Sequence, residues 1–148
     1  MTAPKDAKVI WQSGLAFEGT AGSGFSVRLD TTPDEGGGSG FSPMELVLVG
    51  LASCTAMDVI SILKKKRQDV TDFEVRAHGL RVDDYPQVFT DIALEYVVRG
   101  HSIDPKAVER SIELSECKYC SVMGMLNKAA KITTTYRVEE ADDAKREA

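Results

Sequence analysis

The sequence predicts an α+β fold in which one long apolar helix is set among short strands. Three observations lead to this class. Apolar residues run almost without interruption from 46 to 63, the stretches before 30 and after 71 are rich in strand formers, and two shorter helical patterns precede the last strand. The predicted order is three strands, a long helix, two strands, two helices and a strand, which places helices over one face of a sheet.

The long helix is expected over residues 42–67. Ser42 and Glu45 form a capping-box pattern with Pro43 at the first helical position. Cations at 64–67 close the segment, where exposed carbonyl groups carry partial negative charge. Because this helix has almost no polar face, we expect protein to wrap it on most sides.

A membrane span is the competing interpretation of this apolar stretch. Asp58 and Ser61 interrupt it before the roughly 20 residues that a bilayer requires. We therefore expect a buried helix and no membrane partner. Cys54 lies near its middle, with Asp58 one turn further along the same face.

Composition favours one domain over residues 1–148. The net charge of -5 argues against a nucleic-acid-binding surface. Three cysteines do not make a disulfide framework, and residues 1–8 lack the apolar core of a signal peptide. A reducing, cytoplasmic setting is therefore expected.

The strands before the helix are predicted at 8–12, 15–20 and 25–29, forming a meander. The segment 31–40 contains Pro33 and three consecutive glycines, so we expect a loop too flexible to form an element, mobile at its tip.

A hairpin is predicted after the helix, with strands at 72–83 and 88–99. The second strand alternates between a dry and a mostly wet face. The residues expected to share the dry face are Val88, Thr90, Ile92, Leu94, Tyr96 and Val98.

The last third of the chain is predicted as two helices and a strand. Asp104 and Pro105 open a helix that ends near Cys117. A short helix follows at about 120–128, then a strand at 132–138 and a charged tail, about 140–148, that we expect to be frayed.

Two thiols on different elements carry the chemical signal. Cys54 by itself fits a small buried hydrophobe. Cys120 is expected at a helix start, where amide groups and the Lys118 cation favour a thiolate, so helix-end electrostatics predict it to be the more acidic thiol. A pair in which one thiol attacks the oxidised other is what a dithiol peroxidase or reductase requires.

Other interpretations of the C-x-x-C spacing at Cys117 and Cys120 remain open. A thioredoxin-like motif should follow a strand, whereas a helix is expected here. A zinc site could combine these thiolates with Cys54 and a histidine, although His78 and His101 lack ligand spacing.

Three motifs resemble the OsmC/Ohr family: Ser-Pro-Met-Glu-Leu at 42–46, Gly-Leu-Ala-Ser-Cys at 50–54 and Lys-Tyr-Cys-Ser-Val at 118–122. The resemblance covers nearly the whole chain. It implies an OsmC-like α+β subunit of order β(3)-α-β(2)-α(2)-β, with a long central buried helix, that forms an intertwined homodimer with a thiol site at each end of its interface.

The resemblance also implies a function, reduction of organic hydroperoxides in the stress response. Cys54 would attack the peroxide and Cys120 would resolve the sulfenic acid to a disulfide. A small or protein dithiol would return the electrons, and no metal or nucleotide cofactor would be required.

The sequence departs from the family pattern at two places. Peroxidase members carry a glutamate directly after the helix proline, whereas Met44 stands here and Glu45 follows one residue later, about 100° around the helix. The expected activating arginine is absent from 15–20, and Arg28 is the only arginine before the helix. These departures keep an alternative open: a dimeric OsmC-like protein that binds an apolar or reactive-sulfur molecule with little turnover. Cys117 has no counterpart in the motif and is either a bystander or a competing resolving thiol.

Overall fold

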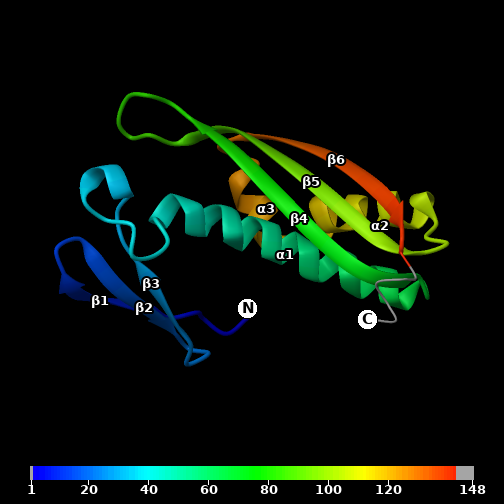
Figure 1. Ribbon diagram of the computed structural model, residues 1–148, viewed down its shortest axis with the longest axis horizontal. Coiled ribbons are helices and arrows are strands. Elements are labelled where there is room, and N and C mark those ends of the chain that lie inside the picture. The colour runs from blue at the N-terminus through cyan, green and yellow to red at the C-terminus, as the bar shows by residue number, and fades with distance from the viewer. Residues whose placement is uncertain (1, 143–148) are drawn as a thin grey trace. The chain divides into compact units, whose positions relative to one another are not determined.

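A computed structural model describes residues 2–142 of the chain (Figure 1). The described residues fall into two compact units, with the boundary between Val47 and Leu48. The predicted order of strands and longer helices is confirmed. The elements are β1 (Ala7–Ser13), β2 (Ala16–Ala21), β3 (Ser26–Leu29), η1 (Pro33–Glu35), α1 (Pro43–Lys65), β4 (Asp69–Arg81), β5 (Phe89–His101), α2 (Pro105–Leu114), η2 (Ser115–Tyr119), α3 (Ser121–Leu126) and β6 (Lys131–Glu140).

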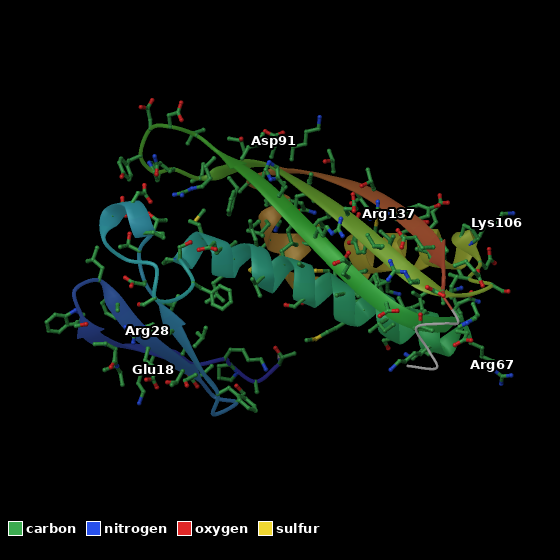
Figure 2. All side chains as sticks on the ribbon, viewed as in Figure 1. Glu18, Arg28, Arg67, Asp91, Lys106 and Arg137 are labelled. Carbon is green, nitrogen blue, oxygen red and sulfur yellow. The ribbon has the colours of Figure 1, made fainter. Side chains whose placement is uncertain are left out.

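The first unit contains the predicted meander. β1, β2 and β3 pair antiparallel in chain order, and Glu18 of β2 lies opposite Arg28 of β3 (Figure 2). Their bounds differ from the predicted ones by at most one residue at each end. Such differences are usual because strand ends are set by pairing as well as by sequence.

The segment 31–40 is more ordered than predicted, since it contains the 3₁₀ turn η1. The Asp30 carboxylate holds both ends of the segment, accepting from the Thr31 amide at 2.7 Å and the Ser39 hydroxyl at 2.5 Å. Gly36, at φ 87°, provides the left-handed residue that ends the turn. The prediction was wrong because the closing contacts join residues nine apart.

The second unit contains a sheet of order β4-β5-β6 (Figure 1). β4 and β5 form the predicted antiparallel hairpin, whereas β6 pairs parallel to β5, from Asp91 opposite Lys131 to Gly100 opposite Glu140. A parallel pair requires a crossover connection, and α2, η2 and α3 provide it.

One face of this sheet is dry, as the alternation predicted for most of β5. Ile92, Leu94, Tyr96 and Val98 are each at most 1% exposed. The first residues of the strand differ from the prediction, because Val88 and Thr90 are exposed and Phe89 is buried.

A register shift explains that exchange. Leu80 pairs with Asp91 but Arg81 pairs with Phe89, so Thr90 is an extra residue and the faces reverse before it. A Cβ on Gly79 would lie only 2.5 Å from the Phe89 ring, so the glycine provides the space that this ring fills.

Helix α1 has the predicted capping box. The Ser42 hydroxyl accepts from the Glu45 amide at 3.2 Å, and the Glu45 carboxylate accepts from the Ser42 amide at 2.9 Å. Protein of the same chain does not wrap the helix on most sides, however. One stripe with a spacing of four is buried, Leu51, Thr55, Val59 and Leu63, while Val49 and Met57 are exposed.

By length and composition alone, α1 could cross a membrane, so the interruption at Asp58 does not by itself exclude a span. In the fold, two polar residues of α1 bond to other elements. Thr55 lies 2.8 Å from the Tyr96 hydroxyl, and Asp58 accepts from Ser115 at 2.9 Å. These bonds join α1 to β5 and η2 within one packed unit.

The crossover differs from the prediction in its middle. The Asp104 carboxylate caps α2 by accepting from the Lys106 amide at 3.0 Å. α2 then ends at Leu114, and the π-helical turn η2 leads to Cys120, where the prediction had one helix ending near Cys117. β6 extends through Glu140, so the predicted tail begins later than 140, and residues 143–148 lie outside the described residues.

Candidate active site

Cys54 lies in the middle of α1 and is half-buried. It directly precedes Thr55, one of the four residues in the buried stripe of this helix. The helix therefore fixes the thiol at the margin of the packed face, where the sulfur is shielded but not enclosed.

Cys120 lies at the amino end of α3, as predicted, and is 5% exposed. Its sulfur caps the helix by accepting from the Met123 amide at 3.3 Å. Burial is the main influence on this thiol and raises its pKa to about 11, although the Met123 amide acts in the opposite direction. The prediction that Cys120 is an acidic thiol was wrong, because desolvation outweighs the amide groups at the helix end.

The structure brings Cys54 and Cys120 together. Cys54 lies close enough to Cys120 for its side chain and its charge to be further causes of the raised Cys120 pKa. Both cysteines are free thiols in the structure. Two cysteines that lie 66 positions apart in sequence are thus near each other in the fold, which the sequence alone could not establish.

Cys117 differs from the other two cysteines because it is exposed. It lies on η2, in the same turn as Lys118, whose amine is 5.2 Å from the centre of the Tyr119 ring. This surface position separates Cys117 from the buried Cys120, three residues away.

A row of buried hydroxyl groups lies beside the thiol pair. Thr55 of α1 contacts the Tyr96 hydroxyl of β5 at 2.8 Å and the Ser115 hydroxyl of η2 at 2.7 Å. Carboxyl groups lie at both ends, since the Ser115 hydroxyl is 2.9 Å from Asp58 Oδ2 and the Tyr96 hydroxyl is 2.8 Å from Glu116 Oε1. We call these five side chains the hydroxyl row.

Tyr96 connects the hydroxyl row electrostatically to the thiols. Burial raises the pKa of its hydroxyl well above the ordinary value, and the hydrogen bond with Thr55 opposes this shift. The charges of Glu116 and Cys120 raise this pKa further. Tyr96 is therefore a neutral phenol at physiological pH and close enough to Cys120 to be influenced by its charge.

The π-turn η2 positions Ser115, Glu116 and Cys120. The Cys120 amide donates to the Ser115 carbonyl at 2.7 Å, five residues back, instead of the usual four. Ser115 and Glu116 both join the hydroxyl row from this turn, and Cys120 ends it. π-Turns are frequent at functional sites, and this one ends at a candidate reactive thiol.

Among residues 2–142, no three His, Cys, Asp or Glu side chains are grouped as metal ligands. His78 is exposed on β4, and His101 Nδ1 lies 3.3 Å from Asp69 Oδ2. Neither histidine is placed with the cysteines as the zinc interpretation requires.

The sequence profile described as OsmC-like protein matches residues 36–135, which include both thiols and the whole hydroxyl row. The chain belongs to the OsmC-like family. Protein YhfA of Escherichia coli (strain K12) is 44% identical over 135 residues, covering 91% of this chain and 98% of that protein.

Solved structures extend the OsmC-like comparison to the fold. A hypothetical protein from Aquifex aeolicus VF5 is 30% identical, with a TM-score of 0.84 over 95% of this chain and 100% of that one. The organic hydroperoxide resistance protein OhrB of Bacillus subtilis is 18% identical, with a TM-score of 0.60 over 89% of this chain and 98% of that one. This chain thus shares its α+β fold with both solved structures, although sequence identity falls from 30% to 18% between them.

Two further candidate residues of this OsmC-like chain have other partners. Glu45 is bonded to Ser42, and that contact with the Ser42 amide is the main reason why the pKa of its carboxyl is below the usual range. The Arg28 guanidinium donates to the Ser39 hydroxyl at 2.9 Å. Each residue thus has a local structural role in the first unit.

Sequence reasoning identified the thiols but missed most of the hydroxyl row. Only Asp58 was noted, because it shares a helix face with Cys54. Thr55 and Ser115 are 60 positions apart, and Thr55 and Tyr96 are 41 apart. The one available signal was the pair of adjacent polar residues Ser115 and Glu116, at the end of a predicted amphipathic helix.

Proposed function

We propose that this OsmC-like chain is a thiol-dependent peroxidase that reduces organic hydroperoxides in the cytoplasm as part of a stress response. The observation that carries the proposal is the proximity of Cys54 of α1 to Cys120 at the start of α3, where Cys54 contributes to the raised Cys120 pKa. Organic hydroperoxide resistance proteins among the structural neighbours support the choice of substrate class.

In the proposed reaction, the Cys54 thiolate attacks one peroxide oxygen and the O–O bond breaks, leaving an alcohol and a Cys54 sulfenic acid. Cys120 then attacks the Cys54 sulfur, which releases water and forms a disulfide. A dithiol reductant returns two electrons. Cys54 fits the attacking role because it is the less enclosed of the two thiols, and Cys120, with its raised pKa, fits the resolving role.

The test is intact mass with disulfide mapping after the reduced protein meets one equivalent of cumene hydroperoxide. Wild type should lose two hydrogens, mapped to Cys54 and Cys120. Cys54→Ser should not react, and Cys120→Ser should retain one added oxygen on Cys54. Cys117→Ser is the matched control and should behave as wild type. Full turnover in Cys54→Ser, or a disulfide at Cys117 in place of Cys120, would contradict the assignment.

We also propose that the protein is a homodimer. Apolar side chains on α1, including Val49 at 45% and Met57 at 69% exposed, leave a surface that a second copy could cover. Light scattering at several protein concentrations should give twice the chain mass of 16.1 kDa. A Met57→Lys variant should shift that mass towards the monomer, and a monomeric wild type would contradict the proposal.

A second candidate is a binding protein for an apolar or reactive-sulfur molecule with little turnover. The engagement of Glu45 with Ser42 and of Arg28 with Ser39 favours it, since both residues already have structural partners. Wild-type protein that fails to consume cumene hydroperoxide with any dithiol, yet retains an apolar ligand through purification, would support binding over catalysis.

A further inference from the structure

The hydroxyl row beside the thiol pair is continuous from one carboxyl group to the other. Its four oxygen–oxygen contacts are Asp58 to Ser115 at 2.9 Å, Ser115 to Thr55 at 2.7 Å, Thr55 to Tyr96 at 2.8 Å and Tyr96 to Glu116 at 2.8 Å. All four distances are those of ordinary O–H···O hydrogen bonds. Each contact therefore requires one hydrogen between its two oxygens.

The three hydroxyl groups cannot supply four hydrogens. Ser115, Thr55 and Tyr96 carry one each, and an ionised carboxylate only accepts. Thr134 donates its own hydrogen to Glu116 at 2.6 Å and adds none to the row. With both carboxylates ionised, one contact would bring two oxygens together without a hydrogen, in a buried site where unmet polar groups are costly.

We propose that the hydroxyl row holds one additional proton, shared between the Asp58 and Glu116 carboxyl groups, and that it serves as a proton relay for the Cys54–Cys120 pair. The catalytic part of this inference rests on the proposed peroxidase function. With the proton at either end, all four contacts are complete, and reversing the hydroxyl groups moves it from one carboxyl to the other.

The position of the row fits this role. Thr55 follows Cys54 on α1, Tyr96 of β5 is influenced by the Cys120 charge, and η2 joins the row directly to Cys120. Asp58 and Glu116 are half-buried, which gives the ends of the row access to solvent. Among the described residues, the bonds and charge effects at the row involve these two carboxyl groups, Tyr96 and Cys120, with Cys54 next to Cys120. Tyr136 of β6 bonds to Glu109 of α2.

In the first half of the reaction, the row donates. The Cys54 thiolate forms an S–O bond to the peroxide, and the electron pair of the O–O bond leaves with the alkoxide. The alkoxide takes the stored proton and departs as an alcohol. The row is then one proton short, with both carboxylates ionised.

In the second half, the row accepts. Cys120 must lose a proton to attack the Cys54 sulfenic acid, and its buried thiol, with a pKa of about 11, needs an acceptor. Tyr96 takes this proton as it passes its own to Glu116. The S–S bond forms, and hydroxide leaves and takes from solvent the proton that Cys54 lost at the start. The row is thereby restored.

The stored proton is tested without peroxide, by urea unfolding of the reduced protein from pH 6 to 8 at one protein concentration. If the folded protein holds one proton more than the unfolded chain, the folding equilibrium constant falls about tenfold for each unit by which the pH rises. Asp58→Asn supplies the missing hydrogen from its amide, so its profile should lack this slope. Asp91→Asn, an exposed change of the same kind on β5, should retain it.

A second pair of variants provides the same test if Asp58→Asn does not fold. The Glu116→Gln amide can donate to Tyr96 and should also remove the slope. Glu109→Gln is its control, because Glu109 accepts from the Tyr136 hydroxyl outside the row. His78 and His101 are present in every variant, so differences between variant and control exclude them. Parallel profiles for Asp58→Asn and Asp91→Asn would overturn the stored proton.

The relay is tested by single turnover with cumene hydroperoxide. In Asp58→Asn, the row is full and cannot accept the Cys120 proton, so the disulfide should form about a hundredfold more slowly and the Cys54 sulfenic acid should accumulate as one retained oxygen. Disulfide formation at the rate of Asp91→Asn would overturn the relay. A wild type that ignores the hydroperoxide would refute the proposed function, while the pH profiles still decide whether the proton is present.

Discussion

The two faces of the β4-β5-β6 sheet differ sharply although each is built from alternate residues of the same strands. On the helix-covered face, the β5 side chains from Ile92 to Val98 are almost fully buried, and their polar member, Tyr96, bonds to Thr55 and Glu116. On the opposite face, charged side chains from the three strands meet in ion pairs, and Arg137 is one of them (Figure 2). Side chains at neighbouring sequence positions therefore mostly differ in their exposure to water.

The ion pairs of the outer face are partly exposed. Arg76 of β4 pairs with Glu95 of β5 at 3.2 Å, and Arg137 pairs with Glu139 within β6 at 3.1 Å. Their side chains are 33–56% exposed, so water competes with each pair. Packing on the helix-covered face should therefore contribute more to stability than the ion pairs of the outer face.

The largest expected effect is on the core of the covered face. Leu94→Ala removes a side chain that is 1% exposed, and should lower the free energy of unfolding by about 2–5 kcal/mol. Glu95→Ala, its neighbour on the outer face, should change it by less than about 1 kcal/mol. Urea unfolding of both variants measures the difference. Equal losses of unfolding free energy would contradict the greater contribution of the helix-covered face.

The next effect concerns the hydroxyl of Tyr96. Tyr96→Phe leaves Glu116 and Thr55 without this partner in a buried site and should cost about 1–3 kcal/mol. Tyr136→Phe removes an exposed phenol that bonds to Glu109, so its cost should stay within about 0.5 kcal/mol. Thermal unfolding should rank the two in this order. A larger loss for Tyr136→Phe would contradict the role given to burial.

A smaller effect should appear in alkaline solution. Because the pKa of Cys120 is raised to about 11, the folded protein keeps a proton there that the unfolded chain, with a thiol pKa of about 8.5, releases. The unfolded state then binds fewer protons, so stability falls as pH rises from about 9 towards 11. Cys120→Ala should reduce this decline, whereas Cys117→Ala, at an exposed position, should leave it unchanged.

The smallest effect is expected on the outer face in acid. The hydrogen bond from Arg99 is the main cause of the lowered pKa of the Glu139 carboxyl. A lowered pKa contributes stability that is present above the unfolded value and is lost as pH falls through the folded one. Glu139→Gln should therefore remove a small part of the acid sensitivity below about pH 4.5. Added salt should reduce the contribution, since the pair is partly exposed.

Sequence reasoning succeeded where the deciding contacts are local. Ser42 and Glu45 are three residues apart, so their capping box could be read directly. The alternation of β5 correctly predicted that Ile92, Leu94, Tyr96 and Val98 would be buried, but it placed Val97, which is 4% exposed, on the wet face. The pairing of Cys54 with Cys120 was inferred from motif resemblance and stays a prediction, although Cys54 is close enough to contribute to the raised Cys120 pKa.

Sequence reasoning failed where contacts between distant segments decide the structure. The reversal of faces at Phe89 depends on the extra residue Thr90 between the Leu80–Asp91 and Arg81–Phe89 pairs, which no alternation pattern reveals. The high pKa of Cys120 depends on burial between elements, whereas helix-end electrostatics can be read from sequence. The hydroxyl row combines α1, β5 and η2, and its geometry depends on a π-turn that has no clear sequence signature.

The parallel pairing of β6 with β5 has a consequence for how the protein is made. Every paired position, from Asp91 with Lys131 to Gly100 with Glu140, joins residues 40 apart. During synthesis, the β4–β5 hairpin emerges with one edge unpaired, and that edge must wait for the three helical segments before its neighbour arrives. Thr134, which bonds to Glu116, is carried by that last strand. The newly made chain therefore passes through a stage in which Cys54 and Cys120 already exist but the strand that completes their surroundings does not, and its unpaired edge is then open to pairing with other chains.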